Sequence, residues 1–180
     1  MIYYFGGKMS ETKKLIVELG DRLAKEIDYG VHSTLSKMFG LNPQMGTYRI
    51  EEECSIQGDV SGLITLTQDK NEGTLIVSFP KATIFGILSK MYRKPFTEIN
   101  QSVKLGVGEL TNIIYGVVKA NLNKSGFSFK MAVPNVIIGD QHTILTCDSG
   151  PTMVVPFNTE LGTFYVLLSF HMQKVNTEAA

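Results

Sequence analysis

The sequence predicts an α+β fold in which two long helices pack on a mostly antiparallel sheet. Apolar residues recur every three or four positions over residues 10–39 and again over 100–123, which is the period of an amphipathic helix. Short β-branched segments separated by tight polar turns follow each helix, as is typical of antiparallel strands. Both halves share the order helix, proline, strands, so Pro43 and Pro134 are equivalent points and we predict an internal duplication.

Composition narrows the possible functions of the chain. Its 180 residues are 43% hydrophobic and carry 17 basic and 17 acidic side chains. A net charge of zero offers no basic patch for nucleic acid, and no apolar run reaches the roughly 18 residues that cross a membrane. Without a signal peptide, and with only the distant Cys54 and Cys147, the chain is predicted to be cytoplasmic with reduced thiols. The three histidines have no metal-ligand spacing, so we expect no metal site.

The first half is predicted to begin with one continuous helix. Ser10 can cap it, and Gly40 and Pro43 end it. A second, short helix begins at Pro80 and ends at residues 93–95, because proline is favoured in the first turn. Strands are expected between the two helices over residues 47–56, 63–67 and 74–79, with turns at 58–62 and 68–73.

The second half repeats this plan. Its helix, from about Asn100 to Asn123, is closed by Ser125 and Gly126. Strands are expected over residues 136–138, 143–147, 152–157 and 163–170, with turns at 139–140, 148–150 and 160–162. We predict three segments: an N-terminal extension over 1–26 that lengthens the first helix, the main domain over 27–172, and a polar tail over 173–180.

The second long helix separates into two faces. At about 100° per residue, one arc gathers its apolar side chains and is expected to be buried: Val103, Val107, Leu110, Ile114, Val117 and Val118. The opposite arc holds Glu109, Asn112, Leu105, Gly116 and Lys119. Glu109 and Asn112 are i and i+3, which makes them neighbours on one exposed surface.

This exposed arc is unusual for a solvated surface. Asn is a poor residue inside a helix, and each glycine there costs about 1 kcal/mol relative to alanine. Gly116 beside Asn112 is useful if another molecule approaches the backbone closely. By spacing alone, a merely solvated face is the alternative. The Gly106-Val107-Gly108 string is not a dinucleotide loop, because no strand precedes it.

An ordered set of segments resembles a known family. It includes residues 108–116 (GELTNIIYG) and 134–139 (PNVIIG), with further matches at 34–40, 61–62, 77–80 and 155–160. Over about residues 27–171 the chain is similar to the CheX branch of the CheC/CheX chemotaxis phosphatases.

The resemblance implies a CheC-like fold, a homodimer, and hydrolysis of the aspartyl phosphate on a phosphorylated CheY-like response regulator. Asn112 would be the catalytic amide that orients the attacking water, and Glu109 would anchor the partner. Leu105, Gly116 and Lys119 would form the surrounding partner-binding surface. Such an enzyme needs no cofactor of its own, because Mg²⁺ comes with the acidic pocket of the partner receiver domain.

One departure from the family pattern keeps a second function open. The family motif carries Asp or Ser four residues before the glutamate, where this chain has Leu105. The alternative is therefore a non-catalytic module of the same fold that binds a response regulator or the flagellar switch. The related fold of the middle domain of FliM indicates that such a scaffold can serve assembly alone. A small-molecule enzyme has little support, because no cluster of titratable groups is evident.

The first long helix is not expected to repeat the site. Aligning the two halves on their prolines places Glu18 and Asp21 at the positions of Glu109 and Asn112. Asp21 has no amide donor and would repel phosphate. We therefore expect one active surface per chain.

Overall fold

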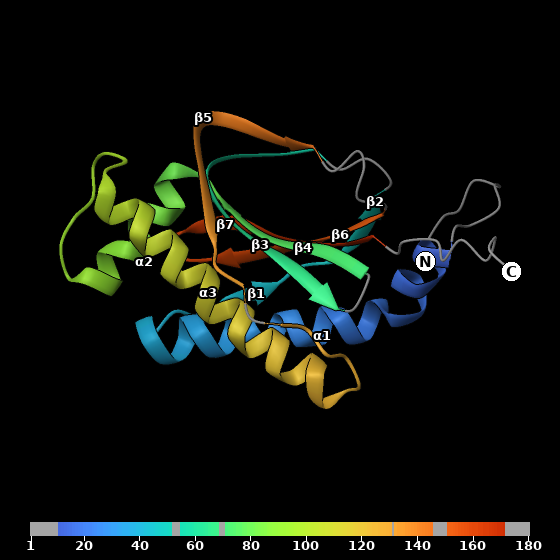
Figure 1. Ribbon diagram of the computed structural model, residues 1–180. Coiled ribbons are helices and arrows are strands. Elements are labelled where there is room, and N and C mark those ends of the chain that lie inside the picture. The colour runs from blue at the N-terminus through green and yellow to red at the C-terminus, as the bar shows by residue number, and fades with distance from the viewer. Residues whose placement is uncertain (1–10, 52–54, 69–70, 131, 146–150, 172–180) are drawn as a thin grey trace, which may run out of the picture.

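A computed structural model describes residues 11–51, 55–68, 71–130, 132–145 and 151–171. The helices and strands follow one another as α1 (Glu11–Phe39), β1 (Gln44–Met45), β2 (Arg49–Glu51), β3 (Ser55–Gln68), β4 (Asn71–Phe79), α2 (Lys81–Tyr92), α3 (Gln101–Lys124), β5 (Asn135–Leu145), β6 (Thr152–Thr159) and β7 (Gly162–His171). All three helices lie on one side of the sheet, and the upper part of β5 rises on the other (Figure 1). The α+β class predicted from the sequence is confirmed.

The sheet has a two-fold plan that accounts for the repeated sequence pattern. Its strands run in the order β1-β6-β7-β4-β3-β5, with β2 also paired to β6, and every pairing is antiparallel. The edge strand that follows α1 pairs with the hairpin of the second half, and β5, which follows α3, pairs with the hairpin of the first. Each half therefore completes the sheet of the other, with β4 and β7 joined at the centre.

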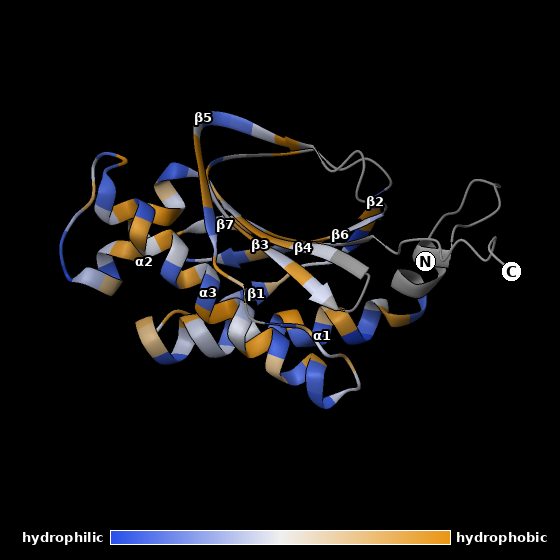
Figure 2. Ribbon diagram, in the orientation of Figure 1, coloured by the Kyte–Doolittle hydropathy of each residue, from blue (hydrophilic) through white to orange (hydrophobic). Residues whose placement is uncertain are grey.

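The main hydrophobic core lies between the helices and the sheet. The central strands are largely apolar, whereas polar residues mark the outward sides of α1 and α3 (Figure 2). Leu23, Ile27 and Val31 of α1 and Leu110 and Ile114 of α3 are fully buried there. These are the positions that helical periodicity assigns to the core, because a period of 3.6 keeps one stripe on the same side.

A close approach between backbone and side chain sets the height of α3 above the sheet. A Cβ atom at Gly62 of β3 would lie 1.9 Å from Thr111 Oγ1, so only glycine fits there. Thr111 is fully buried and its hydroxyl donates to the Val107 carbonyl over 2.8 Å. The residue next to the predicted catalytic amide is thereby pressed against the sheet, which fixes the rotation of the helix.

Two predicted turns are wrong, at residues 58–62 and 139–140. The chain continues as strand through both, and the β3–β5 pairing shifts register between Gly58 and Val60. Gly-Asp dipeptides occur in β-bulges as well as in turns, and here the facing strand extends the ladder past the irregularity. Beyond the bulge, β3 and β5 form an arm whose Ile56 and Ile144 pack on the face of the sheet opposite the helices.

The remaining elements differ little from expectation. The strand predicted over residues 47–56 is shorter, because β2 covers only Arg49–Glu51 and residues 52–54 lie outside the described residues. The hairpin of β3 and β4, the helix beginning after Pro80 and the last two strands are confirmed. Cys54, Cys147 and the predicted tail lie outside the described residues.

Asp59, at the bulge, ties the arm to α2. Its Oδ2 accepts a hydrogen bond from the Lys81 backbone N–H over 2.6 Å, and its Oδ1 accepts one from the Gln141 N–H over 2.9 Å. Pro80 gives α2 no side-chain cap, so the carboxylate of Asp59 supplies the missing acceptor at this helix N-terminus. The Gln141 hydrogen bond foremost, with further help from the Lys81 N–H and nearby positive charge, holds the pKa of Asp59 below its usual value despite partial burial.

Replacing Asp59 with asparagine is expected to destabilise the fold at neutral pH by about 1–2 kcal/mol, because one of the two N–H groups loses its acceptor and the other keeps only an uncharged one. A lowered pKa in the folded state adds stability that is present above the unfolded pKa, near 3.8, and lost as the pH falls through the folded pKa. The stability gap between wild type and Asp59→Asn should therefore narrow below about pH 4. Urea unfolding at pH 7, 5, 4 and 3 measures it, and a gap independent of pH would contradict this account.

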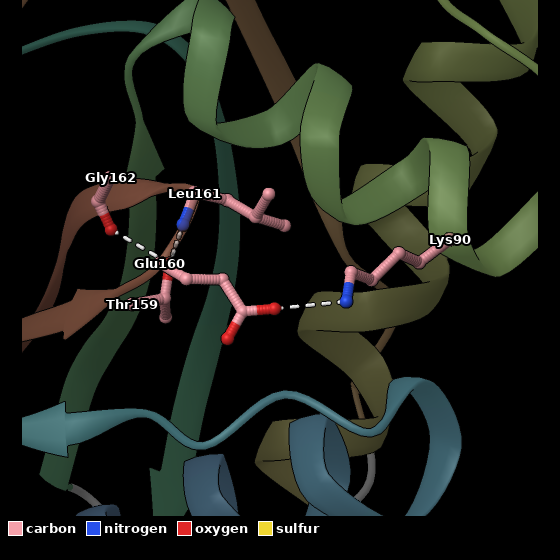
Figure 3. A network of polar contacts seen from close by, with 5 residues as sticks. All are labelled: Lys90, Thr159, Glu160, Leu161 and Gly162. Atoms are coloured by element: carbon pink, nitrogen blue, oxygen red, sulfur yellow. Dashed lines mark hydrogen bonds and ion pairs between the residues drawn. The ribbon is translucent and has the colours of Figure 1, made fainter.

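The opposite end of the same helix is held by polar contacts with the β6–β7 turn. Lys90 Nζ lies 2.9 Å from Glu160 Oε1 (Figure 3). Within the turn, Thr159 Oγ1 donates to the Gly162 carbonyl over 2.9 Å and accepts from the Leu161 N–H over 3.1 Å. The ion pair links the last turn of α2, which carries Tyr92, to the β6–β7 turn.

Candidate functional site

Helix α3 presents the predicted site residues on its outward side. Asn100 caps the helix by accepting from the Ser102 and Val103 N–H groups. The predicted buried arc is largely confirmed, with Val117 only half-buried. The five residues of the opposite arc are all solvent-accessible: Leu105, Glu109, Asn112, Gly116 and Lys119.

Asn112 lies at the edge of a hollow formed by the chain that returns from α3. The hollow, about 340 Å³ in volume, is lined by Asn112, Ala132, Val133 and Pro134. It is open to solvent on the side of Val133, which is 83% exposed. The amide is therefore half-buried against a proline wall, so a small molecule or a water beside it is sheltered on one side.

The wall of this hollow is positioned by two residues of α3 itself. Asn123 holds the returning chain by accepting from the Phe129 N–H over 2.9 Å and donating to the Phe129 carbonyl over 3.1 Å. One residue later, the buried Tyr115 hydroxyl donates to the Lys130 carbonyl over 2.5 Å. Burial raises the pKa of Tyr115, so the hydroxyl remains a donor. The returning chain therefore runs alongside α3 as far as Pro134.

Tyr92 reaches the other side of the helix from α2. A Cβ atom at Gly106 would lie 3.1 Å from Tyr92 Cε2 and 2.7 Å from Leu88 Cδ2, so this glycine makes room for both side chains. Burial chiefly, and then the negative charge of the Glu109 carboxylate, raise the pKa of Tyr92. The ring edge also contacts Phe96, with centroids 5.8 Å apart.

The two predicted catalytic side chains have no hydrogen-bond or ion-pair partner among the described residues. Within that part of the chain, neither Glu109 nor Asn112 makes a hydrogen bond or ion pair. Thr111, between them, is fully satisfied by the Val107 carbonyl. An unpaired carboxylate and an unpaired amide side by side are available to a molecule that docks from outside.

The equivalent surface of α1 differs chemically. Asp21, which aligns with Asn112, accepts a hydrogen bond from the Tyr48 hydroxyl over 2.7 Å. Its carboxylate is thus engaged within the chain and offers no amide donor.

Sequence reasoning missed two neighbours of the pair, Tyr92 and Val133. Both lie on segments whose distance from α3 is decided by packing, so no local period indicates them. Only Pro134, the residue next to Val133, pointed to this part of the chain, because it lies in the segment 134–139 that resembles the CheX family. Among the described residues, no three His, Cys, Asp or Glu side chains are grouped to hold a metal ion. None of the described helices combines the length and apolarity needed to cross a bilayer.

The architecture first identifies the class of protein. Two helices laid over an antiparallel sheet of interlocked halves also occur in a CheC-like superfamily protein from Shewanella sp. PV-4. That structure is 30% identical, with a TM-score of 0.77 over 83% of this chain and 97% of that one. The protein is therefore CheC-like in fold.

The chain belongs to the CheX family within this class. The family described as "Chemotaxis phosphatase CheX" matches residues 60–158. The chemotaxis protein CheX from Desulfovibrio desulfuricans is 32% identical, with a TM-score of 0.76 over 83% of this chain and 99% of that one. The comparison with curated protein sequences finds no significant match.

A more distant structure shares the fold. It is the CheX-CheY-BeF3-Mg²⁺ complex from Borrelia burgdorferi, 22% identical, with a TM-score of 0.66 over 82% of this chain and 97% of that one.

Proposed function

We propose that the protein hydrolyses the aspartyl phosphate of a CheY-like response regulator and thereby terminates a chemotaxis signal. Because the chain belongs to the CheX family, one structural observation is the main support for this proposal. The Asn112 amide stands at the edge of an open hollow, next to the exposed Glu109, and neither has a hydrogen-bond partner within the described residues.

Asn112 orients the nucleophile. A water oxygen attacks phosphorus, the bond from phosphorus to the aspartyl oxygen breaks, and inorganic phosphate and the free carboxylate result. Such a transfer requires a water held in line with the leaving oxygen. A carboxamide is no base at neutral pH, but its oxygen accepts from water and its nitrogen donates. Pro134 and Val133 limit the positions that this water can take.

Glu109 anchors the partner. An ionised carboxylate only accepts hydrogen bonds, so it would repel a phosphoryl group and suits a cation on the regulator instead. Lys119, two turns from Asn112 on the same arc, complements the acidic pocket of a receiver domain. That pocket would bring Mg²⁺ with it. CheY is the partner in the Borrelia burgdorferi complex, which supports a regulator of this kind here.

The experiment follows phosphate release from phosphorylated regulators of the same genome, with and without the protein. Faster release at substoichiometric amounts of protein is expected for at least one regulator. Unchanged decay of every regulator that binds would overturn the catalytic proposal. It would favour the non-catalytic binding module, for which the apolar Leu105, 61% exposed, is the supporting observation.

We also propose a homodimer joined through the edge of β5. This strand pairs with β3 on one side only among the described strands, and its Ile137 and Ile138 are each 38% exposed. An apolar edge strand is a template for pairing with a second chain. Sedimentation should give twice the 19.9 kDa chain mass, and Ile138→Lys should give the monomer. A wild type that remains monomeric, or equal dimerisation of Ile138→Lys, would contradict this.

A further inference from the structure

The chain that leads from α3 back to β5 is anchored at its start by hydrogen bonds to its own backbone (Figure 1). Asn123, in the last turn of α3, accepts from the Phe129 N–H over 2.9 Å and donates to the Phe129 carbonyl over 3.1 Å. The Tyr115 hydroxyl donates to the Lys130 carbonyl over 2.5 Å, and the Lys130 N–H donates to the Thr67 carbonyl of β3 over 3.2 Å. Two consecutive residues are thereby tied both to the helix and to the sheet.

The same chain is anchored again where it enters β5. Asn135 is paired with Leu63 in the β3–β5 ladder. A Cβ atom placed at Gly108 of α3 would lie 3.9 Å from Pro134 Cγ and 3.6 Å from Val136 Cγ2, which is ordinary van der Waals distance. The start of the strand therefore lies directly on the helix, one turn before Asn112.

The residues between these two anchors form one side of the hollow beside Asn112. Ala132, Val133 and Pro134 line it, and we call these three residues the wall. Neither Tyr115 nor Asn123 lines the hollow, and Tyr115 is only 1% exposed. Both side chains therefore influence the hollow only through the backbone that they bind.

The position of the wall matters for a reaction in which an amide orients water. The water is held by Asn112 on one side and confined by the wall on the other. Displacing a reacting group by about 1 Å can slow a reaction by up to about a hundredfold. A phenylalanine would fill the space of the Tyr115 ring equally well, so the buried hydroxyl serves the contact with the Lys130 carbonyl.

We propose that Tyr115 and Asn123 are positioning residues, which hold the wall beside Asn112 so that the amide and the attacking water keep the orientation that hydrolysis requires. The proposal rests on the function proposed above. It adds two residues that contact neither the phosphate nor the regulator, and it assigns them to the chemical step and not to binding.

The test removes an anchor without altering the surface of the hollow. Tyr115→Phe keeps the buried ring and loses only the hydroxyl, and Asn123→Ala loses both hydrogen bonds to Phe129. Each should lower kcat about tenfold, because the water is no longer held in line. KM should stay within about twofold, as should the affinity for regulators treated with beryllofluoride, which mimics the phosphorylated state. Tyr165→Phe removes a hydroxyl on the far face of the sheet and should behave as wild type.

A double-mutant cycle distinguishes positioning from a general loss of stability. In the Asn112→Ala background, Tyr115→Phe should change kcat by less than about twofold, because the amide that depends on the wall is already absent. A purely structural defect would lower kcat by the same factor in both backgrounds. That result, or a rise in KM with unchanged kcat, would overturn the proposal.

A second measurement needs no turnover. The side-chain NH₂ of Asn112 gives an NMR signal that is assigned by its loss in Asn112→Ala. Tyr115→Phe should shift this signal and raise the mobility of the Val133 backbone amide, whereas Tyr165→Phe should do neither. Unchanged signals in Tyr115→Phe would overturn the proposal.

The two measurements together separate this proposal from the enzymatic one. If no regulator is dephosphorylated but the Asn112 and Val133 signals respond as stated, the wall stands as the support of Asn112 and the enzymatic proposal fails. If Tyr115→Phe and Asn123→Ala turn over like wild type while Asn112→Ala is inactive, the positioning proposal is overturned and the enzymatic one stands.

Discussion

Replacing Asn112 with alanine is expected to slow dephosphorylation of the regulator by on the order of a hundredfold, the loss seen when one orienting donor is removed from a transition state. The affinity for the phosphorylated regulator should stay within about twofold, because the amide is one small group at the edge of a much larger contact. Phosphate release at saturating regulator measures the first quantity, and calorimetry with the beryllofluoride form measures the second.

Two further variants sharpen this result. Asn112→Asp keeps the shape but replaces the donor with a negative charge, so it should lose both turnover and affinity. Asn42→Ala, which removes an exposed amide in the loop after α1, should behave as wild type. Turnover by Asn112→Ala at the wild-type rate would show that another group orients the water.

Replacing Gly116 with glutamate is expected to weaken regulator binding by on the order of a hundredfold while leaving the fold intact. No described atom lies within 4 Å of a Cβ placed at Gly116, so the substitution meets no neighbour inside the chain. Removing a helical glycine should even stabilise the protein, by up to about 1 kcal/mol for Gly116→Ala. The loss would come from bulk and negative charge where the acidic face of the partner approaches.

The matched control places the same charge one turn away. Ala120→Glu carries it at another exposed position of α3, where a weaker effect is expected because the side chain lies farther from Asn112. Thermal unfolding checks that both variants fold. If Gly116→Glu binds as tightly as wild type, the partner does not approach this helix closely and the docking surface must be sought elsewhere.

Much of the fold could be predicted from the hydrophobic periodicity of the sequence. The apolar stripe of residues 100–123 indicated both the buried arc and the exposed Glu109 and Asn112, because residues three and four apart share a helical face. The shared order of helix, proline and strands indicated the duplication that the sheet displays. Membership of the CheX family could also be predicted from the sequence, since the segments around Asn112 and Pro134 resemble that family.

Prediction from local patterns failed where the same sequence motif occurs both in turns and in β-bulges. The Gly-Asp pairs at residues 58–59 and 139–140 are typical of turns, yet here they lie in a bulge. Whether a chain reverses or bulges depends on how far the facing strand continues, and that strand is supplied by the other half of the protein.

Helical spacing in the sequence is enough to identify the residues that could face a partner: the amide of Asn112, the carboxylate of Glu109 and the open position of Gly116. Their surroundings depend on how distant segments of the chain pack together. The hollow exists because Tyr115 and Asn123 bind the returning chain, and Tyr92 reaches the site because Gly106 admits its ring. Backbone periodicity fixes the directions of side chains that are close in sequence, whereas contacts between distant segments depend on the packing of the whole chain.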